Sequence, residues 1–170
     1  MSEQQQSKMG KWMLIFAWAA GLGLLTMLFD EQLAEQLNPN AQPISSVKAG
    51  ISEVRLKQNR YGHYVSGGSI NGQPVIFLLD TGATDVSIPF HLAEQLNLQG
   101  GRRSWVQTAN GRIEVAQTTI ARLAIGDIQL FDVNANLNPG VKQNEILLGM
   151  SALKQLEFSQ KGEWLVLRSL

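Results

Sequence analysis

The stretch Val75-Ile-Phe-Leu-Leu-Asp-Thr-Gly-Ala-Thr-Asp-Val-Ser-Ile-Pro89 predicts a buried strand that delivers one carboxylate, Asp80, into a turn. The apolar run from Val75 to Leu79 has the length and composition typical of a buried strand. A carboxylate at the end of such a strand is costly unless it is hydrogen-bonded or shares a proton. Thr81 supplies a hydroxyl, and Gly82 lets a backbone amide approach closely. Asp80 is therefore a candidate acid or base, and the alternative is an ordinary Asx-type turn after a strand.

Composition limits the remaining chemistry. The chain has 170 residues, with 14 acidic and 14 basic side chains and 44% hydrophobic residues, which suits one globular domain plus an additional segment. A formal net charge of zero without a dense basic block gives no electrostatic case for binding nucleic acid. There is no cysteine, which excludes disulfides, thiolate nucleophiles and cysteine metal sites. A zinc site or a Ser/His triad would depend on His63 or His91, so we expect neither a metal nor another cofactor.

Residues 12–29, WMLIFAWAAGLGLLTMLF, form a charge-free apolar segment that predicts a transmembrane helix. Lys8 and Lys11 precede the segment and Asp30 follows it directly. The positive-inside rule therefore places residues 1–11 in the cytoplasm and the rest of the chain on the other side of the membrane. A cleaved signal peptide is one alternative, but the segment ends without a small-x-small cleavage site, which favours an uncleaved signal anchor. A buried core helix is another, and the charge asymmetry argues against it.

A connector is expected between the membrane segment and a soluble domain. Residues 31–37 could continue as a short polar helix, which Asn38-Pro39 would end. The following prolines, serines and glycine indicate an extended or flexible tether. The sequence thus predicts a linker at residues 30–50 and a soluble domain at residues 51–170.

The soluble domain has the pattern of short strands separated by turns. Alternating polar and apolar residues at 53–57 predict a half-buried strand, with residues 61–70 as its partner across Asn59-Arg60. Asn71-Gly72 predicts a hairpin ahead of the central strand. Further strands are expected at 118–125, 128–133, 145–149 and 164–167, and helices at 90–98 and 151–158.

A second Asn-Gly, at residues 110–111, lies within an expected hairpin from Trp105 to Gln117. A two-residue turn at this dipeptide gives the cross-strand partners Ala109–Arg112, Thr108–Ile113 and Val106–Val115. The hairpin would then have one mainly apolar face, with Val106, Thr108, Ile113 and Val115, and one mixed face, with Trp105, Gln107, Arg112 and Glu114. Such a ribbon folds over a cleft or caps the core.

Two strand-to-helix junctions repeat at an offset of sixty residues. Val86–Pro89 precedes one expected helix and Ile146–Gly149 precedes the other, with Gln95 aligned to Gln155. The order hairpin, strand, short helix therefore occurs in each half of the domain. The second half has no Asp-Thr-Gly at the position that Asp80 holds in the first.

Three features together resemble the retropepsin-like aspartic proteases, the single-domain relatives of pepsin. They are the apolar strand ending in Asp80-Thr81-Gly82-Ala83, the hairpin at the position of the family's flap, and the second apolar-Gly motif Leu147-Leu148-Gly149 before a short helix. The likeness covers roughly residues 50–168. The resemblance implies an all-β fold, a closed retropepsin-like β-barrel with one or two short helices, preceded in this chain by the transmembrane helix.

The resemblance also implies a homodimer that hydrolyses a peptide or protein substrate. Asp80 of each protomer would meet at the two-fold axis and activate a water between them. Thr81 would link the two loops, the Gly82 amide would steady the carboxylate, and Ala83 would keep the floor of the site small. The flap residues that would close over substrate are Thr108, Ala109, Asn110, Gly111 and Arg112. The anchored form looks like those of Gram-negative bacteria, which implies a single-pass inner-membrane protein with a periplasmic protease domain.

The chain departs from the retroviral pattern at two coupled positions. Retroviral enzymes usually carry Asp two residues after the Gly and Arg directly after the later Gly, whereas this chain has Thr84 and Met150. Because both charges are absent together, no unpaired buried charge remains, but the usual dimer-stabilising pair is lost. Two anchors in one membrane would raise the effective concentration and compensate. The alternative function is a non-catalytic periplasmic binding or assembly module that retains the fold.

Overall fold

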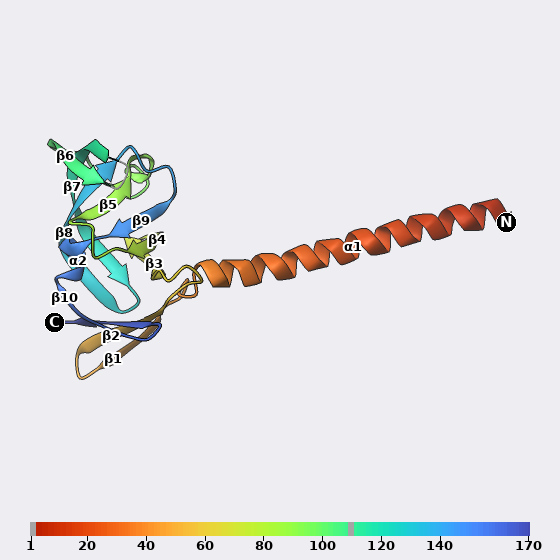
Figure 1. The fold of residues 1–170 in the computed structure, drawn as a ribbon, viewed down its shortest axis with the longest axis horizontal. Helices are drawn as coiled ribbons and strands as arrows, with labels where there is room; N and C mark the ends of the chain where they lie inside the picture. Colours follow the sequence, from red (N-terminus) through yellow and green to blue (C-terminus); the bar gives the residue numbers. More distant parts are fainter. Residues whose placement is uncertain (1–2, 109–110) are drawn as a thin grey trace. The chain divides into compact units, whose positions relative to one another are not determined.

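The computed structural model describes residues 3–108 and 111–170, which form a helical unit ending at Gln36 and a folded unit from Leu37 to Leu170 (Figure 1). Helix α1 spans Glu3–Leu37, and it ends where the sequence predicts because Asn38-Pro39 cannot continue it. Its large apolar side chains from Trp12 to Phe29 are exposed. Within the described residues, the stretch Gly10–Leu37 is long and apolar enough to cross a membrane, as an anchor or as a signal sequence.

The folded unit is mostly β, which confirms the predicted fold class. Its strands and short helices, in chain order, are β1 Ile44–Lys48, β2 Ile51–Lys57, β3 Val65–Ile70, β4 Gln73–Leu79, β5 Val86–Pro89, η1 Phe90–Leu92, β6 Arg103–Thr108, β7 Gly111–Ile125, β8 Ile128–Asn138, β9 Glu145–Leu148, α2 Met150–Leu153, β10 Leu156–Lys161 and β11 Trp164–Ser169.

These strands form two sheets. The four-stranded sheet has the order β1-β2-β11-β10, so the last strand of the unit, β11, pairs with the second, β2. The seven-stranded sheet has the order β3-β4-β9-β5-β8-β7-β6, and an additional pairing of β3 with β7 closes six of its strands into a ring. The last strand, β6, pairs with β7 alone and projects as a hairpin.

One hydrophobic core is shared by both sheets. In β2, Val54 and Leu56 are fully buried while Arg55 between them is exposed, as expected of a strand with one face on the core. They belong to the same buried cluster as Phe77 of β4 and Leu167 of β11. The four-stranded sheet is therefore an integral layer of the domain.

The segment assigned from sequence to a linker, residues 30–50, is largely folded. Residues up to Leu37 are helical, and β1 pairs antiparallel with β2 from Ile44↔Arg55 to Lys48↔Ile51. The polar composition that suggested a tether instead suits an edge strand, because only one edge of β1 is paired. The folded unit thus begins before the predicted boundary near Gly50.

The predicted pairing of residues 53–57 with residues 61–70 is wrong. Strand β2 pairs with β1 and β11, whereas β3 pairs with β4 and β7 in the other sheet. The Asn59 side chain redirects the chain, since its Oδ1 accepts hydrogen bonds from the amides of Tyr61 and His63 at 2.9 and 3.0 Å. The next predicted turn, Asn71-Gly72, does join β3 to β4, with Ile70 opposite Gln73.

Both predicted helices are shorter than expected. Residues 90–98 contain only the 3₁₀ turn η1, because Leu96 and Leu98 are both buried and Asn97 between them adopts a φ of 54°. After α2, Leu156 enters β10 and pairs with Ser169 rather than continuing a helix. Tertiary pairing overrides helical spacing in the second case.

The topology agrees with the predicted repeat. Strand β9 runs parallel to β4, and β5 runs parallel to β8, so each half contributes a strand to the other half. Strands β5 and β9 meet antiparallel at the pair Ser87↔Leu147, two residues that are sixty apart. The two halves are therefore related by an approximate two-fold symmetry, centred on this pair, that interchanges β4 with β8 and β9 with β5.

Candidate active site

Asp80 lies in a loop directly after β4, beside the end of β9. Its amide donates to the Leu148 carbonyl at 3.1 Å, which continues the β4–β9 ladder by one residue. Its Oδ1 accepts a hydrogen bond from the Gly82 amide at 2.8 Å, and its carbonyl accepts from the Ala83 amide at 3.2 Å. Asp80 is partly exposed, while Thr81 and Gly82 are exposed. The run predicted as a buried strand does form β4, but only Phe77 in it is fully buried and Ile76 is exposed. Strand β4 thus presents one oriented carboxylate in a partly exposed loop.

The second apolar-Gly motif holds this loop in place. Leu148 is fully buried, and a β-carbon on Gly149 would collide with the backbone carbonyls of Ala83 and Asp85. Only glycine lets the two segments approach so closely. The Met150 amide then donates to the Ala83 carbonyl at 2.8 Å. The structure therefore brings the two motifs together, as their joint appearance in the sequence suggests.

Ser151 is a supporting residue that the sequence pattern did not reveal. Its Oγ accepts from the Val86 amide at 3.0 Å and donates to the Asn134 carbonyl at 2.7 Å, and its amide donates to the Thr84 carbonyl at 2.9 Å. The side chain is buried. The Ser151 hydroxyl thus links β5 to β8, and the Ser151 amide links both to the Asp80 loop, where Thr84 and Met150 take the positions of the retroviral ion pair.

The loop after β8 is the counterpart of the Asp80 loop in the second half. Leu79 pairs with Leu148, and the two-fold relation of the halves maps this pair onto Leu137 with Ile88. Asn138, the last residue of β8, therefore corresponds to Asp80, the residue directly after β4. The Gly140 amide donates to Asn138 Oδ1 at 2.9 Å, which repeats the bond between Gly82 and Asp80. Asn138 is buried, with its Nδ2 3.4 Å from Ser87 Oγ. The degenerate loop keeps the turn geometry and replaces the carboxylate by an amide.

The expected flap is a hairpin formed by β6 and the start of β7. Its register differs from the prediction, because Val106 pairs with Ile113, Gln107 with Arg112, and Thr108 with Gly111. Ala109 and Asn110 lie outside the described residues. The register differs by two residues, so each side chain stays on the face of the hairpin that was predicted for it.

The two faces of this hairpin differ in exposure. Trp105 and Arg112 are exposed, and the Arg112 guanidinium lies 5.1 Å from the centre of the Trp105 ring. Val115 on the other face is buried, and Ile113 lies so close to Gly140 that it would contact any side chain there. The apolar face therefore packs toward the loop after β8, and the mixed face meets solvent.

One chain provides one carboxylate at this site. Among residues 3–108 and 111–170, no group of three or more His, Asp or Glu side chains converges as a metal site would require. Two carboxylates about 3 Å apart share one proton and can activate a water, whereas a single one lacks the acid partner. The Asp80-Thr81-Gly82 loop of one chain therefore presents a single carboxylate.

Comparisons with known proteins agree with this geometry. A family model described as "gag-polyprotein putative aspartyl protease" matches residues 66–155, which include the Asp80 loop and the Leu147-Leu148-Gly149 motif. The crystal structure of a retropepsin-like aspartic protease from Rickettsia conorii is similar with a TM-score of 0.59 and 25% sequence identity, over 75% of this chain and 96% of that chain. An uncharacterized protein in the cobV 5′ region of a Sinorhizobium species is 30% identical over 135 residues, 78% of this chain. The chain spans 58% of the length of that relative.

The chain belongs to the gag-polyprotein aspartyl protease family and has the retropepsin-like fold, which confirms the resemblance inferred from the sequence. The matched region begins in β3 and ends just after α2. Helix α1, β1, β2 and the final hairpin of β10 and β11 lie outside it.

Proposed function

We propose that the protein is a membrane-anchored aspartic endopeptidase that works as a homodimer. The observation that carries the proposal is the placement of Asp80-Thr81-Gly82 on a largely exposed loop directly after β4, within a family of aspartyl proteases. Because one chain contributes one carboxylate, a second copy supplies the other. The substrate is a peptide or protein, and the reaction is hydrolysis of a peptide bond.

In this mechanism the two Asp80 carboxyl groups share one proton across the two-fold axis. Like charges at about 3 Å disfavour double ionisation, so one group stays protonated and the pair titrates as a unit. The ionised group takes a proton from a water held between them, and the protonated group polarises the substrate carbonyl. The Gly82 amide already donates to Asp80 Oδ1 and keeps the carboxylate oriented. The expected consequence is an acidic pH optimum.

Three further groups support this reaction in the proposal. Thr81, exposed beside Asp80, would bond to the partner's loop, and Ala83 leaves the floor of the site small. The hairpin tip, where the Thr108 hydroxyl donates to the Gly111 carbonyl at 2.7 Å, would close over the substrate and exclude water.

Helix α1 would anchor the enzyme in the inner membrane. Lys8 and Lys11 before the apolar segment, and Asp30 after it, favour a cytoplasmic N-terminus and a periplasmic protease domain. Two anchored chains share one membrane, which raises their effective concentration and favours dimerisation.

The test compares peptide hydrolysis by the folded unit, residues 37–170, in the wild type, in Asp80→Asn and in the matched control Asp132→Asn. Asp132 is an exposed carboxylate on β8, outside the Asp80-Thr81-Gly82 loop. Cleavage between pH 3 and pH 8 should fall at least a thousandfold in Asp80→Asn and stay unchanged in Asp132→Asn, since catalysis requires the dyad. Equal activity of the wild type and Asp80→Asn would refute the proposal.

The alternative function, a binding or assembly module without catalysis, is favoured by the absence of the ion pair at Thr84 and Met150. It predicts that the folded unit stays monomeric at millimolar concentration and has no Asp80-dependent cleavage. Analytical ultracentrifugation alongside the peptide assay separates the two functions.

A further inference from the structure

The connection between the helix and the folded unit is much shorter than the sequence suggests. Only Asn38 and Pro39 separate Leu37, the last residue of α1, from Asn40, which is buried. The Leu37 carbonyl accepts from Asn59 Nδ2 at 3.1 Å, and the Ala41 amide donates to the Asn38 carbonyl at 3.3 Å. The turn is thus bonded to itself and to the folded unit.

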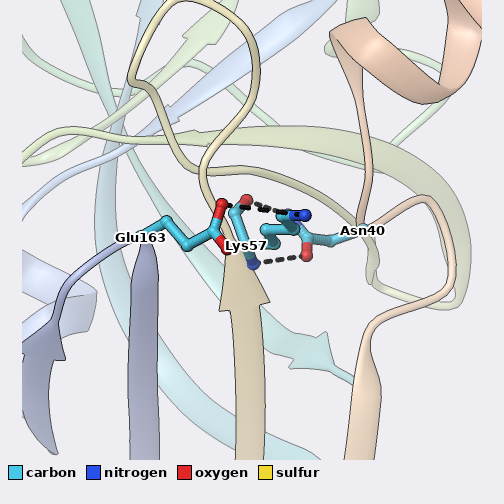
Figure 2. Close-up of polar contacts among 3 residues, drawn as sticks. All are labelled: Asn40, Lys57 and Glu163. Carbon is cyan, nitrogen blue, oxygen red and sulfur yellow. Dashed lines mark hydrogen bonds and ion pairs between the residues drawn. The ribbon is translucent and has the colours of Figure 1, made fainter.

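Asn40 fastens this turn to both sheets. Its Nδ2 donates to the carbonyl of Lys57 in β2 at 2.8 Å, and its Oδ1 accepts from the Lys57 amide at 2.7 Å (Figure 2). The same Nδ2 also donates to the carbonyl of Val65 in β3 at 2.7 Å. Its backbone carbonyl accepts from the Gly67 amide at 2.9 Å. A β-carbon on Gly67 would collide with the Ala41 carbonyl, so the segment lies flat against β3. Because Lys57 and Val65 belong to different sheets, release of Asn40 would expose unpaired groups in both.

These contacts limit how far the folded unit can move from the end of the apolar segment. The eight residues 30–37 are helical and add about 12 Å at 1.5 Å per residue. Residues 38–40 add at most about 10 Å when extended. Asn40 therefore lies no more than about 22 Å along the chain from Phe29, whereas a flexible tether over residues 30–50 would reach about 70 Å.

We infer that the protease acts on polypeptide segments at the membrane surface. The inference rests on the proposed function, an anchored protease. A folded unit of this size has a diameter of about 35–40 Å, so with the connector its site reaches about 60 Å from the bilayer at most. Segments close to a transmembrane span or lipid anchor lie within that distance, and segments held farther out do not.

The experiment uses the full chain reconstituted in lipid vesicles with two single-pass reporters. Both carry the same unstructured casein segment, placed either directly after the span or after a helical spacer of 60 residues, about 90 Å long. A protease variant carries a 20-residue Gly/Ser insert between Gln36 and Leu37, which leaves the folded unit intact. A control variant carries the same insert between Ser7 and Lys8, before the apolar segment. Casein free in solution, with and without Asp80→Asn, reports catalysis independently of the membrane.

The wild type and the control variant should cut the short reporter at least ten times faster than the long one. The insert between Gln36 and Leu37 should restore cutting of the long reporter, while all three proteins cut free casein equally. Equal rates of the wild type on both reporters would overturn the inference while leaving the proposed function in place. Absence of Asp80-dependent cleavage of free casein would instead overturn the proposed function, and the inference with it.

Discussion

Replacing Asn40 tests whether the connector is part of the fold. Asn40→Ala removes the hydrogen bonds to Lys57 N, Lys57 O and Val65 O, and the alanine side chain has no polar atom that could replace them. A buried backbone group left unpaired costs about 1–3 kcal/mol. The Val65 carbonyl is buried, whereas the Lys57 groups are partly accessible to water and cost less. We expect a total loss of about 3 kcal/mol, a large part of the 5–15 kcal/mol typical of a domain.

Two companion variants sharpen this prediction. Asn40→Asp keeps the size of the side chain but loses both donated bonds and places a charge beside two carbonyl oxygens, so it should destabilise more than Asn40→Ala. Asn134→Ala is the matched control, because the Asn134 side chain is exposed and its change should stay within about 0.5 kcal/mol. The ion pair of Lys57 with Glu163, 3.7 Å long and exposed, should contribute less than about 1 kcal/mol (Figure 2).

The assay is urea unfolding of residues 37–170, followed by tryptophan fluorescence. With a slope of about 1–3 kcal/mol per molar for a domain of this size, Asn40→Ala should lower the midpoint by about 1–3 M without changing the slope. A midpoint equal to that of Asn134→Ala would refute the reasoning, because the connector would then be held by contacts other than the Asn40 side chain.

Three further predictions concern the candidate site, one hairpin turn and a buried tyrosine. Gly149→Ala should destabilise the folded unit by about 3 kcal/mol and reduce peptide hydrolysis, because the added carbon collides with the carbonyls of Ala83 and Asp85. Urea unfolding and the peptide assay on the same variant measure the two effects. Ala49→Asn should raise the free energy of unfolding by about 0.5–1 kcal/mol, because Ala49 has a φ of 50° in a two-residue hairpin turn that favours Asn-Gly, and an unchanged urea midpoint would contradict it. The Tyr64 hydroxyl is buried, and burial raises the pKa of Tyr64 above 10.0, an effect that a side-chain hydrogen bond with Gln58 partly opposes. Because the pKa is raised in the folded state, its contribution to stability is complete below pH 10 and is lost as the pH rises above the folded-state pKa. At pH 7 the free energy of unfolding of Tyr64→Phe should therefore equal that of the wild type. Between pH 9 and pH 11 the variant should lose less stability than the wild type.

Much of the candidate site could be predicted from the sequence because its signals are local. The run ending at Leu79 predicts a strand, and Asp80-Thr81-Gly82 predicts the turn that follows it, since both depend on neighbouring residues only. The predicted burial of that strand was wrong except at Phe77. The Asn71-Gly72 hairpin was predicted for the same reason, and the structure has it. The repeat at an offset of sixty residues could also be recognised in the sequence, and in the structure Ser87 pairs with Leu147 at that same separation.

The supporting residues could not be predicted because their partners are distant in the chain. Ser151 bonds to Val86 and Asn134, and no periodicity marks a serine that does so. Asn138 is recognised as the counterpart of Asp80 only when the register of β8 against β5 is known. The flap register also differed, because an Asn-Gly dipeptide allows more than one position of the turn.

The sequence by itself determined the apolar helix, the β class and the carboxylate-bearing loop, since each follows from composition or from contacts within a few residues. The tertiary structure alone decided where the folded unit begins and how the two halves exchange strands. Residues 40–48 carry the composition of a tether, and they fold because Asn40 and β1 find partners in β2 and β3. Long-range hydrogen bonds of this kind depend on the whole fold, which is why the local pattern could not show them.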